Sequence, residues 1–281
     1  MSGESAKGGV IIPFLLVTLI WSSTWIVIRD QLAAVPPSWS VCYRFLLGAV
    51  GMALFAIARR VPLRLPPAGI AFAAVLGIAQ FVLNFNFVYR AEHYLTSGVV
   101  ATVYALLLIP NSILGWIAFR QPVSRSFILG SLVAIAGIAL LLLREYRAAP
   151  VSAEAVLLGI ALSAAGLLSA STANVMQGMQ IARRLPMAAV LTWAMLIGSM
   201  ADALYAWATV GPPVIERRAG YLLGIAWLGI AGSVITFPLY FQLIQRMGPG
   251  RAAYSSVLIP VIAMLISTLA TGYRWSTSSE A

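Results

Sequence analysis

The chain has 281 residues; 61% of them are hydrophobic, 9% are charged, and the formal net charge is +10. A soluble domain of this size carries about 25% charged residues, so the composition excludes an ordinary soluble protein and indicates that lipid surrounds most of the surface. The positive charge would suggest nucleic acid as the partner of a soluble protein. Here it fits basic loops beside an anionic leaflet, and we expect no nucleic-acid partner.

Nine segments are apolar and long enough to cross a bilayer, which takes about 20 residues of helix. The connections between them are short and hold nearly all of the charge and much of the proline, so none can form a separate soluble domain. The predicted spans are 10–29, 38–58, 68–89, 95–118, 127–143, 155–180, 187–210, 220–245 and 251–271.

Loop charges predict how the chain enters the membrane. Counted in alternate loops, ten lysine and arginine residues fall on the side of the N-terminus and seven on the other side. Because basic residues are enriched in cytoplasmic loops, this bias favours a cytoplasmic N-terminus. We therefore expect a multi-pass protein of the cytoplasmic (inner) membrane, with the lipid bilayer as its surroundings.

The first two spans carry aromatic and charged residues within apolar sequence. Trp21 and Trp25 flank three hydroxyl residues, and Trp21 lies deeper than the usual interfacial tryptophan. Arg44, beside Tyr43, is six residues into the span that starts at 38. A charge at this depth costs at least about 2.5 kcal/mol, which makes Arg44 a candidate substrate contact. The alternative is structural: Arg44 reaches toward the interface or binds carbonyl groups of a broken helix.

Polar residues share helix faces in the third and fourth spans. Gln80 and Asn84 are four residues apart, and Tyr104 and Asn111 are seven apart, so each pair lies on one face. An amide in hydrocarbon needs a partner, so these faces point toward protein or a wet cavity. Substrate contact and hydrogen bonding between helices both fit this pattern.

The sixth and seventh spans add three features. Asp202 is the only acidic residue within a predicted span, and it is a candidate coupling group, a partner for Arg44, or part of a wet helix end. Trp193 is deep enough in its span to be a cavity candidate. Small residues at four-residue spacing indicate close helix packing, and we assign no chemistry to them: Gly166, Ala170 and Asn174.

Two stretches far apart in the chain share one pattern. LTSGVVATVYALLLIPN at 95–111 and MGPGRAAYSSVLIP at 247–260 both read Gly, five residues, Tyr, five residues, Pro. This spacing pairs Tyr104 with Tyr254 and Pro110 with Pro260. Proline removes a backbone hydrogen bond, and interrupted spans at matching positions point to the central site of a transporter. We expect both tyrosines to contact substrate and both prolines to act in gating.

A second match fixes the length of the repeat. LGIA at 76–79 in the third span returns at 228–231 in the eighth, an offset of 152. The third span then matches the eighth and the fourth matches the ninth, which gives a unit of five spans. Because five is odd, the second copy enters the membrane with opposite polarity. We predict an all-α polytopic membrane protein with inverted-topology repeats of five transmembrane helices, residues 10–143 and 155–271, in which the tenth helix is missing from this chain.

Several of these features together resemble the EamA family of the drug/metabolite transporter superfamily. They are LLVTLIWSSTWIVIRDQ in the first span, Pro36-Pro37, Tyr43-Arg44-Phe45 and the two LIP sequences. The resemblance covers nearly the whole chain and implies ten helices around a central cavity, with export of amino acids or other small metabolites. Among the members of this family, the chain resembles aromatic amino-acid exporters. The family commonly has an acidic residue where the fourth and ninth helices end, whereas this chain has Gln121 and Thr271 near those places.

The sequence therefore predicts a secondary transporter that exports a small metabolite, an aromatic or apolar amino acid, by alternating access. The ring of the substrate would stack on Trp or Tyr, and the charged end of the substrate would contact Arg44. A flippase-like exporter of lipids, amphiphiles or drugs would use similar walls and stays open. An intramembrane enzyme is the other alternative, but His93 has no metal-ligand spacing around it, and no G-x-S-x-G or phosphate-binding motif is present. We expect neither metal nor cofactor, and the sequence leaves the oligomeric state open.

Overall fold

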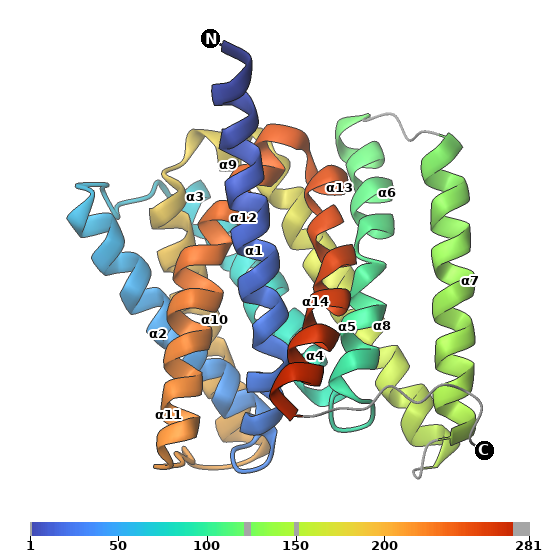
Figure 1. Cartoon of the computed structure of the whole chain (residues 1–281). Coiled ribbons are helices and arrows are strands. Elements are labelled where there is room, and N and C mark those ends of the chain that lie inside the picture. Colours follow the sequence, from blue (N-terminus) through green and yellow to red (C-terminus); the bar gives the residue numbers. More distant parts are fainter. Residues whose placement is uncertain (1, 121–124, 149–151, 272–281) are drawn as a thin grey trace.

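In a computed structural model, residues 2–120, 125–148 and 152–271 are described, and these residues form helices and no β-strand (Figure 1). The predicted all-α fold is confirmed. The first half comprises α1 (Ser2–Leu32), α2 (Pro37–Ala58), α3 (Pro67–Gly77), η1 (Ile78–Asn84), α4 (Phe85–Ala91), α5 (Ser97–Ala105), α6 (Leu108–Phe119) and α7 (Arg125–Ala148). The second half comprises α8 (Ala153–Gly178), α9 (Gln180–Arg184), α10 (Met187–Thr209), α11 (Ala219–Ala226), η2 (Trp227–Ile235), α12 (Thr236–Met247), α13 (Pro249–Ala252) and α14 (Tyr254–Thr271).

Most predicted spans correspond to helices that can cross a bilayer. Among the described residues, seven continuous helical stretches are long and apolar enough to do so. The predicted span 127–143 falls within α7, where the apolar stretch is Phe127–Leu140, and the predicted span 251–271 falls on α13 and α14. The seven stretches are Gly9–Leu32, Pro37–Ala58, Pro67–Ala91, Ser97–Phe119, Ala153–Gly178, Met187–Thr209 and Ala219–Met247.

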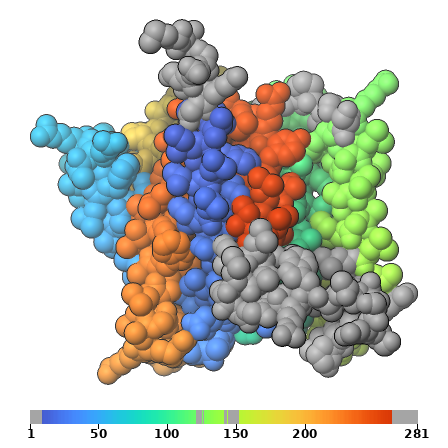
Figure 2. Space-filling model, viewed as in Figure 1, coloured from blue at the N-terminus to red at the C-terminus, as the bar shows by residue number. Residues whose placement is uncertain are grey.

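The helices that open the two halves run in opposite directions. Figure 1 shows α1 descending from the N-terminus at the top of the view, whereas α8 rises from the bottom toward α9. An antiparallel relation between these two helices is what an inverted repeat with five spans per unit requires. Figure 2 shows α1 lying across one face of the molecule with α14 beside it, and α1 also packs against α12. Elements of both halves are therefore interleaved.

The third span of each half contains a π-helical segment, which the predicted spans 68–89 and 220–245 do not indicate. η1 joins α3 to α4, and η2 joins α11 to α12, at matching places in the two halves. A π segment inserts residues into the helical ladder, which redirects carbonyl groups toward other donors and often marks a functional site. The carbonyl of Gly232 in η2 accepts from the hydroxyl of Thr236, from the indole of Trp21 and from the guanidinium of Arg44.

The fourth span is interrupted just before Pro110. α5 ends at Ala105 and α6 begins at Leu108. The backbone amide of Ile109 donates to the carbonyl of Leu106, because Pro110 has no N–H group to donate to that carbonyl. Pro260, by contrast, lies inside the continuous helix α14. The two prolines share a sequence pattern, but only the first is accompanied by a break in the helix at that place.

Candidate functional site

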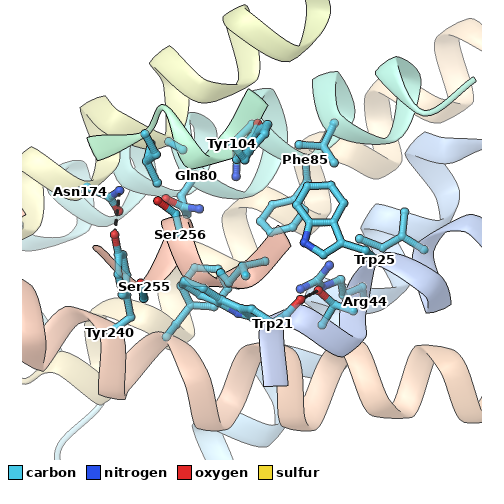
Figure 3. A pocket seen from close by; sticks show the side chains of 18 residues that line it. Trp21, Trp25, Arg44, Gln80, Phe85, Tyr104, Asn174, Tyr240, Ser255 and Ser256 are labelled. Atoms are coloured by element: carbon cyan, nitrogen blue, oxygen red, sulfur yellow. Dashed lines mark hydrogen bonds between the residues drawn. The ribbon is translucent and has the colours of Figure 1, made fainter. Parts of the chain in front are cut away.

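A cavity lies between the two halves, with walls from α1, α2, η1, α4 and α5 on one side and α8, α12 and α14 on the other (Figure 3). Its volume is about 100 Å³, on a scale where a single water molecule needs about 10–15 Å³. The cavity can therefore hold a small molecule rather than one water. Its lining residues are Trp21, Thr24, Trp25, Ile28, Arg44, Gln80, Asn84, Phe85, Val88, Tyr104, Leu107, Ala170, Asn174, Phe237, Tyr240, Ser255, Ser256 and Ile259.

Arg44 supplies the positive charge of this cavity. Its side chain is 1% exposed, and its guanidinium lies 4.4 Å from the centroid of the Phe85 ring. Nε donates to the hydroxyl of Ser233 at 3.4 Å, and Nη2 donates to the carbonyl of Gly232 at 3.4 Å. Nη1 has no hydrogen-bond partner among the described residues. A buried cation with long bonds and one free donor group is suited to receive an anion.

Aromatic rings form much of the wall. Trp21 packs against Tyr240 with ring centroids 4.9 Å apart and against Phe237 at 5.5 Å. Trp25 packs edge-on against Tyr104, with centroids 5.8 Å apart. Behind these rings, Phe45, Phe81 and Phe241 continue the cluster into the core. Such walls offer ring faces and edges on which an aromatic or aliphatic group can pack.

Amide and hydroxyl groups gather at the other end of the cavity. Figure 3 shows Asn174 and Tyr240 facing each other there, away from Arg44, Trp25 and Phe85. Nδ2 of Asn174 lies 3.5 Å from the Tyr240 hydroxyl and 3.4 Å from Oδ1 of Asn111. These bonds are long, so a polar group of a bound molecule could compete for the same partners.

Tyr104 links the walls of the first half to α8. Its hydroxyl donates to Oδ1 of Asn84 at 2.7 Å, which ties α5 to η1. Gly166 of α8 faces this hydroxyl, and a Cβ atom at that position would collide with it. Nearby, Oε1 of Gln80 is buried and has no donor in the described part of the chain. The predicted small-residue seam thus makes room for the Tyr104 hydroxyl, and its members Ala170 and Asn174 also line the cavity.

Six residues predicted as substrate contacts line this one cavity, although they come from four elements: Trp21, Trp25, Arg44, Gln80, Asn84 and Tyr104. Helical periodicity placed Gln80 with Asn84, but only the tertiary structure brings them to Arg44.

Four other predicted contacts lie outside the lining. The hydroxyl of Tyr43 donates to the carbonyl of Val214, and the indole of Trp193 donates to the carbonyl of Leu63, so both anchor connections between helices. Tyr254 is 49% exposed and points away from the cavity wall. Asn111 is fully buried; it donates to the carbonyl of Pro249 and reaches the cavity only through Asn174. Three of these side chains are hydrogen-bonded elsewhere and the fourth is exposed, which sequence spacing cannot reveal.

Asp202 does not pair with Arg44. Its Oδ1 accepts from Nδ2 of Asn86 on α4 at 2.6 Å, and no described lysine or arginine lies within ion-pair distance.

Of the two predicted gating prolines, neither lines the cavity, but each lies near a lining residue: Pro110 near Leu107 and Pro260 next to Ile259. Within the described ranges, no group of three or more His, Cys, Asp or Glu side chains could hold a metal ion.

Sequence reasoning missed four prominent wall residues. It assigns no role to Phe85, Phe237 or Tyr240, and it places Asn174 only in a packing seam. A signal was present: the offset of 152 that relates the third and eighth spans also pairs Phe85 with Phe237. Two aromatic residues at equivalent places of an inverted repeat face the same central space from opposite halves.

Comparisons with known proteins agree with this architecture. The sequence model of the EamA-like transporter family matches residues 9–143 and again 157–279. Protein PagO of Salmonella typhimurium is 26% identical over 97% of this chain and 88% of its own length. The uncharacterized inner membrane transporter YedA of Escherichia coli is 27% identical over 89% of this chain and 79% of its own length. One solved crystal structure shares the fold, with a TM-score of 0.75 at 21% identity, covering 97% of this chain and 91% of the other.

Proposed function

Because the chain belongs to the EamA-like transporter family, it is a membrane transporter, and we propose that it exports amino acids with aromatic or apolar side chains. In this proposal the protein is a secondary transporter of the inner membrane, with its N-terminus in the cytoplasm. The substrate crosses through the central cavity by alternating access. YedA, a relative, is named an inner membrane transporter, and the excess of basic residues on the N-terminal side supports the orientation.

One observation carries the choice of substrate: Arg44, whose buried Nη1 has no hydrogen-bond partner among the described residues, lines a cavity walled by aromatic rings. A carboxylate would satisfy Nη1 and offset the cost of burying the charge of Arg44. A ring or aliphatic side chain on the same molecule would pack against Trp21, Trp25 or Phe237. Aromatic and apolar amino acids combine these two groups in one small molecule.

The ammonium group of such a substrate needs acceptors. The carbonyl oxygen of the Gln80 side chain is buried without a donor, and the hydroxyl groups of Ser255 and Ser256 line the opposite wall from α14. These groups can accept hydrogen bonds from an ammonium group. A zwitterion would therefore find a cation, neutral acceptors and apolar walls within one cavity.

Alternating access requires that two halves rock around a fixed site. The proposed moving parts are the segments around Pro110 and Pro260, since a helix without a full hydrogen-bond ladder deforms at lower cost. Both segments adjoin cavity residues, Leu107 in the first half and Ile259 in the second. Rearrangement there would open the cavity first to one side of the membrane and then to the other.

Counterflow in proteoliposomes tests the proposal. Vesicles are loaded with one unlabelled amino acid, and uptake of the same labelled amino acid is followed for each of the twenty common amino acids. We expect transient accumulation for phenylalanine, tryptophan, tyrosine, leucine or isoleucine and none for aspartate, glutamate, lysine or arginine. If none of the twenty amino acids shows counterflow but a lipid or a lipophilic drug does, the flippase-like alternative replaces the proposal.

A further inference from the structure

A second polar site lies beside the cavity. Asp202 of α10 is fully buried within a membrane-spanning helix, and Asn86 of α4, also within such a helix, is 6% exposed. Nδ2 of Asn86 uses its hydrogens for two acceptors, Oδ1 of Asp202 at 2.6 Å and the carbonyl of Val82 at 2.9 Å. Oδ2 of Asp202 and Oδ1 of Asn86 are both buried with no donor in the described part of the chain.

This environment is unsuited to a permanent carboxylate anion. An ionised aspartate can accept about four hydrogen bonds, yet Asp202 receives one, from a neutral amide. No described basic side chain forms an ion pair with it. An uncompensated charge away from water is costly, and an acidic group within a span usually marks a proton or ion pathway. A proton on Oδ2 removes the charge and turns one unsatisfied acceptor into a donor.

A metal ion fits less well. Such an ion would need several oxygen ligands around it, whereas the buried side-chain oxygens without a donor that the described residues offer at this place are Oδ2 of Asp202 and Oδ1 of Asn86. The site is therefore suited to a ligand that binds to a single oxygen atom. That ligand is a proton.

Two helices connect this site to the cavity. On α2, Cys42 packs in one cluster with Ala203 and Ala206 of α10, and two positions further along, Arg44 lines the cavity. On α4, Asn86 bonds Asp202 while its neighbour Phe85 lies against the Arg44 guanidinium at 4.4 Å. A change in the charge of Asp202 therefore acts on the two elements that hold the cation of the cavity, and α4 follows directly on the π segment η1.

We propose that Asp202 is a proton-binding site that couples proton movement to substrate exchange, with Asn86 as the residue that orients it. This inference rests on the proposed transport function. The proton binds Oδ2 when the site opens to one side and leaves from Oδ2 to the other side. No other bond changes, and the driving energy is the proton gradient across the membrane.

The other ionisable groups around α10 do not neutralise Asp202. Besides Cys42 on α2, Tyr221 of α11 packs in the same cluster and is bonded to Ser40. On α4, Arg90 donates to Tyr205, one turn further along α10, and its guanidinium lies over that ring. α3 and η1 contain no ionisable residue. Arg183 and Arg184 of α9 come before the first turn of α10, and Arg246 of α12 donates to the carbonyl of Gly9.

The first test needs no substrate. Infrared spectra of the purified full chain at pH 7 are compared for the wild type, Asp202→Asn and Asp30→Asn. Asp30 is a matched control because its carboxylate pairs with Arg218 at the surface, 2.7 Å away. We expect the protonated-carboxyl carbonyl band of the wild type to lose intensity in Asp202→Asn and to keep it in Asp30→Asn. Identical bands in all three proteins would overturn the proposal.

The second test separates coupling from transport, with labelled L-phenylalanine as the probe. With one proton exchanged per substrate, a difference of one pH unit sustains an about tenfold concentration ratio. We expect wild type and Asp30→Asn to approach this ratio under one polarity of the pH gradient. Asp202→Asn should keep counterflow but reach a ratio of about one, and Asp202→Glu, which restores a titratable group, should recover accumulation.

The outcomes are distinguishable. If Asp202→Asn accumulates L-phenylalanine as the wild type does, or if a sodium gradient drives accumulation where the pH gradient does not, the proton site is wrong and the transport function stands. If the wild type gives no counterflow with L-phenylalanine or any other amino acid, the proposed function fails, and the infrared comparison alone decides whether Asp202 carries a proton. Should Asp202→Asn not fold, Asp202→Glu must still accumulate the probe, and a ratio of one for that variant would overturn the proposal.

Discussion

The guanidinium of Arg44 lies 4.4 Å from the centroid of the Phe85 ring, and the ring of Phe45 approaches it at 5.1 Å. Ring faces attract a cation, most strongly where water is absent. They do not replace hydrogen bonds, however, and Nη1 remains without a partner among the residues described. The two rings therefore hold Arg44 in place while leaving part of its binding capacity for an anion.

Arg44→Ala should weaken substrate binding strongly. A hydrogen bond to a charged group contributes about 1.5–3 kcal/mol, which corresponds to an about 10- to 100-fold increase in the KM for amino-acid transport. Arg44→Lys should recover only part of the affinity, because an ammonium group lacks the planar donor fork of arginine. Initial rates in proteoliposomes measure both. Arg64→Ala, an exposed loop arginine, is the control, and an unchanged KM in Arg44→Ala would exclude Arg44 from binding.

Tyr104→Phe and Tyr254→Phe should differ although the two tyrosines are equivalent in sequence. The Tyr104 hydroxyl donates to Asn84 at 2.7 Å, whereas Tyr254 is 49% exposed. Side-chain hydrogen bonds between membrane helices couple by about 0.6 kcal/mol on average and reach about 1.7 kcal/mol. We expect a coupling of this size between Tyr104→Phe and Asn84→Ala in a double-mutant cycle of unfolding in mixed micelles. Equal effects of the two tyrosine variants would contradict the assignment.

Pro110→Ala should slow transport without weakening binding. The substitution supplies an N–H group that can bond the carbonyl of Leu106 and thereby favours a continuous helix across the break between α5 and α6. We expect the turnover number to fall about tenfold, which corresponds to an increase of about 1.4 kcal/mol in the barrier, with KM within a factor of about two. Pro13→Ala within α1 is the control. Unchanged turnover in Pro110→Ala and Pro260→Ala together would remove the prolines from the gating mechanism.

Glu92→Gln should change how stability depends on pH. Glu92 follows the last residue of α4; burial raises the pKa of its carboxyl group to about 8, although a hydrogen bond from Ser97 and the charge of Arg29 act in the opposite direction. In the unfolded chain a glutamate has a pKa of about 4.3. The folded state therefore holds this proton more tightly, and the resulting stabilisation is complete below about pH 4 and is lost as the pH rises through about 8.

The measurement is thermal unfolding in detergent between pH 5 and 9, over which the wild type should lose stability relative to Glu92→Gln. Glu154→Gln, at the exposed start of α8, should follow the wild type. Parallel curves for the wild type and Glu92→Gln would show that Glu92 contributes no pH dependence.

Sequence by itself determined the class of this protein. The apolar segments and sparse charges require a helical membrane protein, because a bilayer leaves no water to satisfy exposed backbone groups. The matching Gly-Tyr-Pro spacing and the LGIA repeat indicated two related halves, and deep polar residues such as Arg44, Gln80 and Asn84 identified part of the cavity wall. These inferences succeed because burying a polar group in lipid is costly, so each such residue signals a nearby partner or cavity.

Only the tertiary structure decided which partner each residue has. Asn86 rather than Arg44 contacts Asp202, Trp193 and Tyr43 bind loop carbonyls, and Tyr254 points outward despite its equivalence to Tyr104. Sequence reasoning also did not predict the π segments η1 and η2, which directly precede the helices that carry the cavity residues Phe85 and Phe237. Spacing along a helix gives the face of a residue, but partners depend on the rotation and approach of neighbouring helices, and these follow from side-chain packing across the whole bundle.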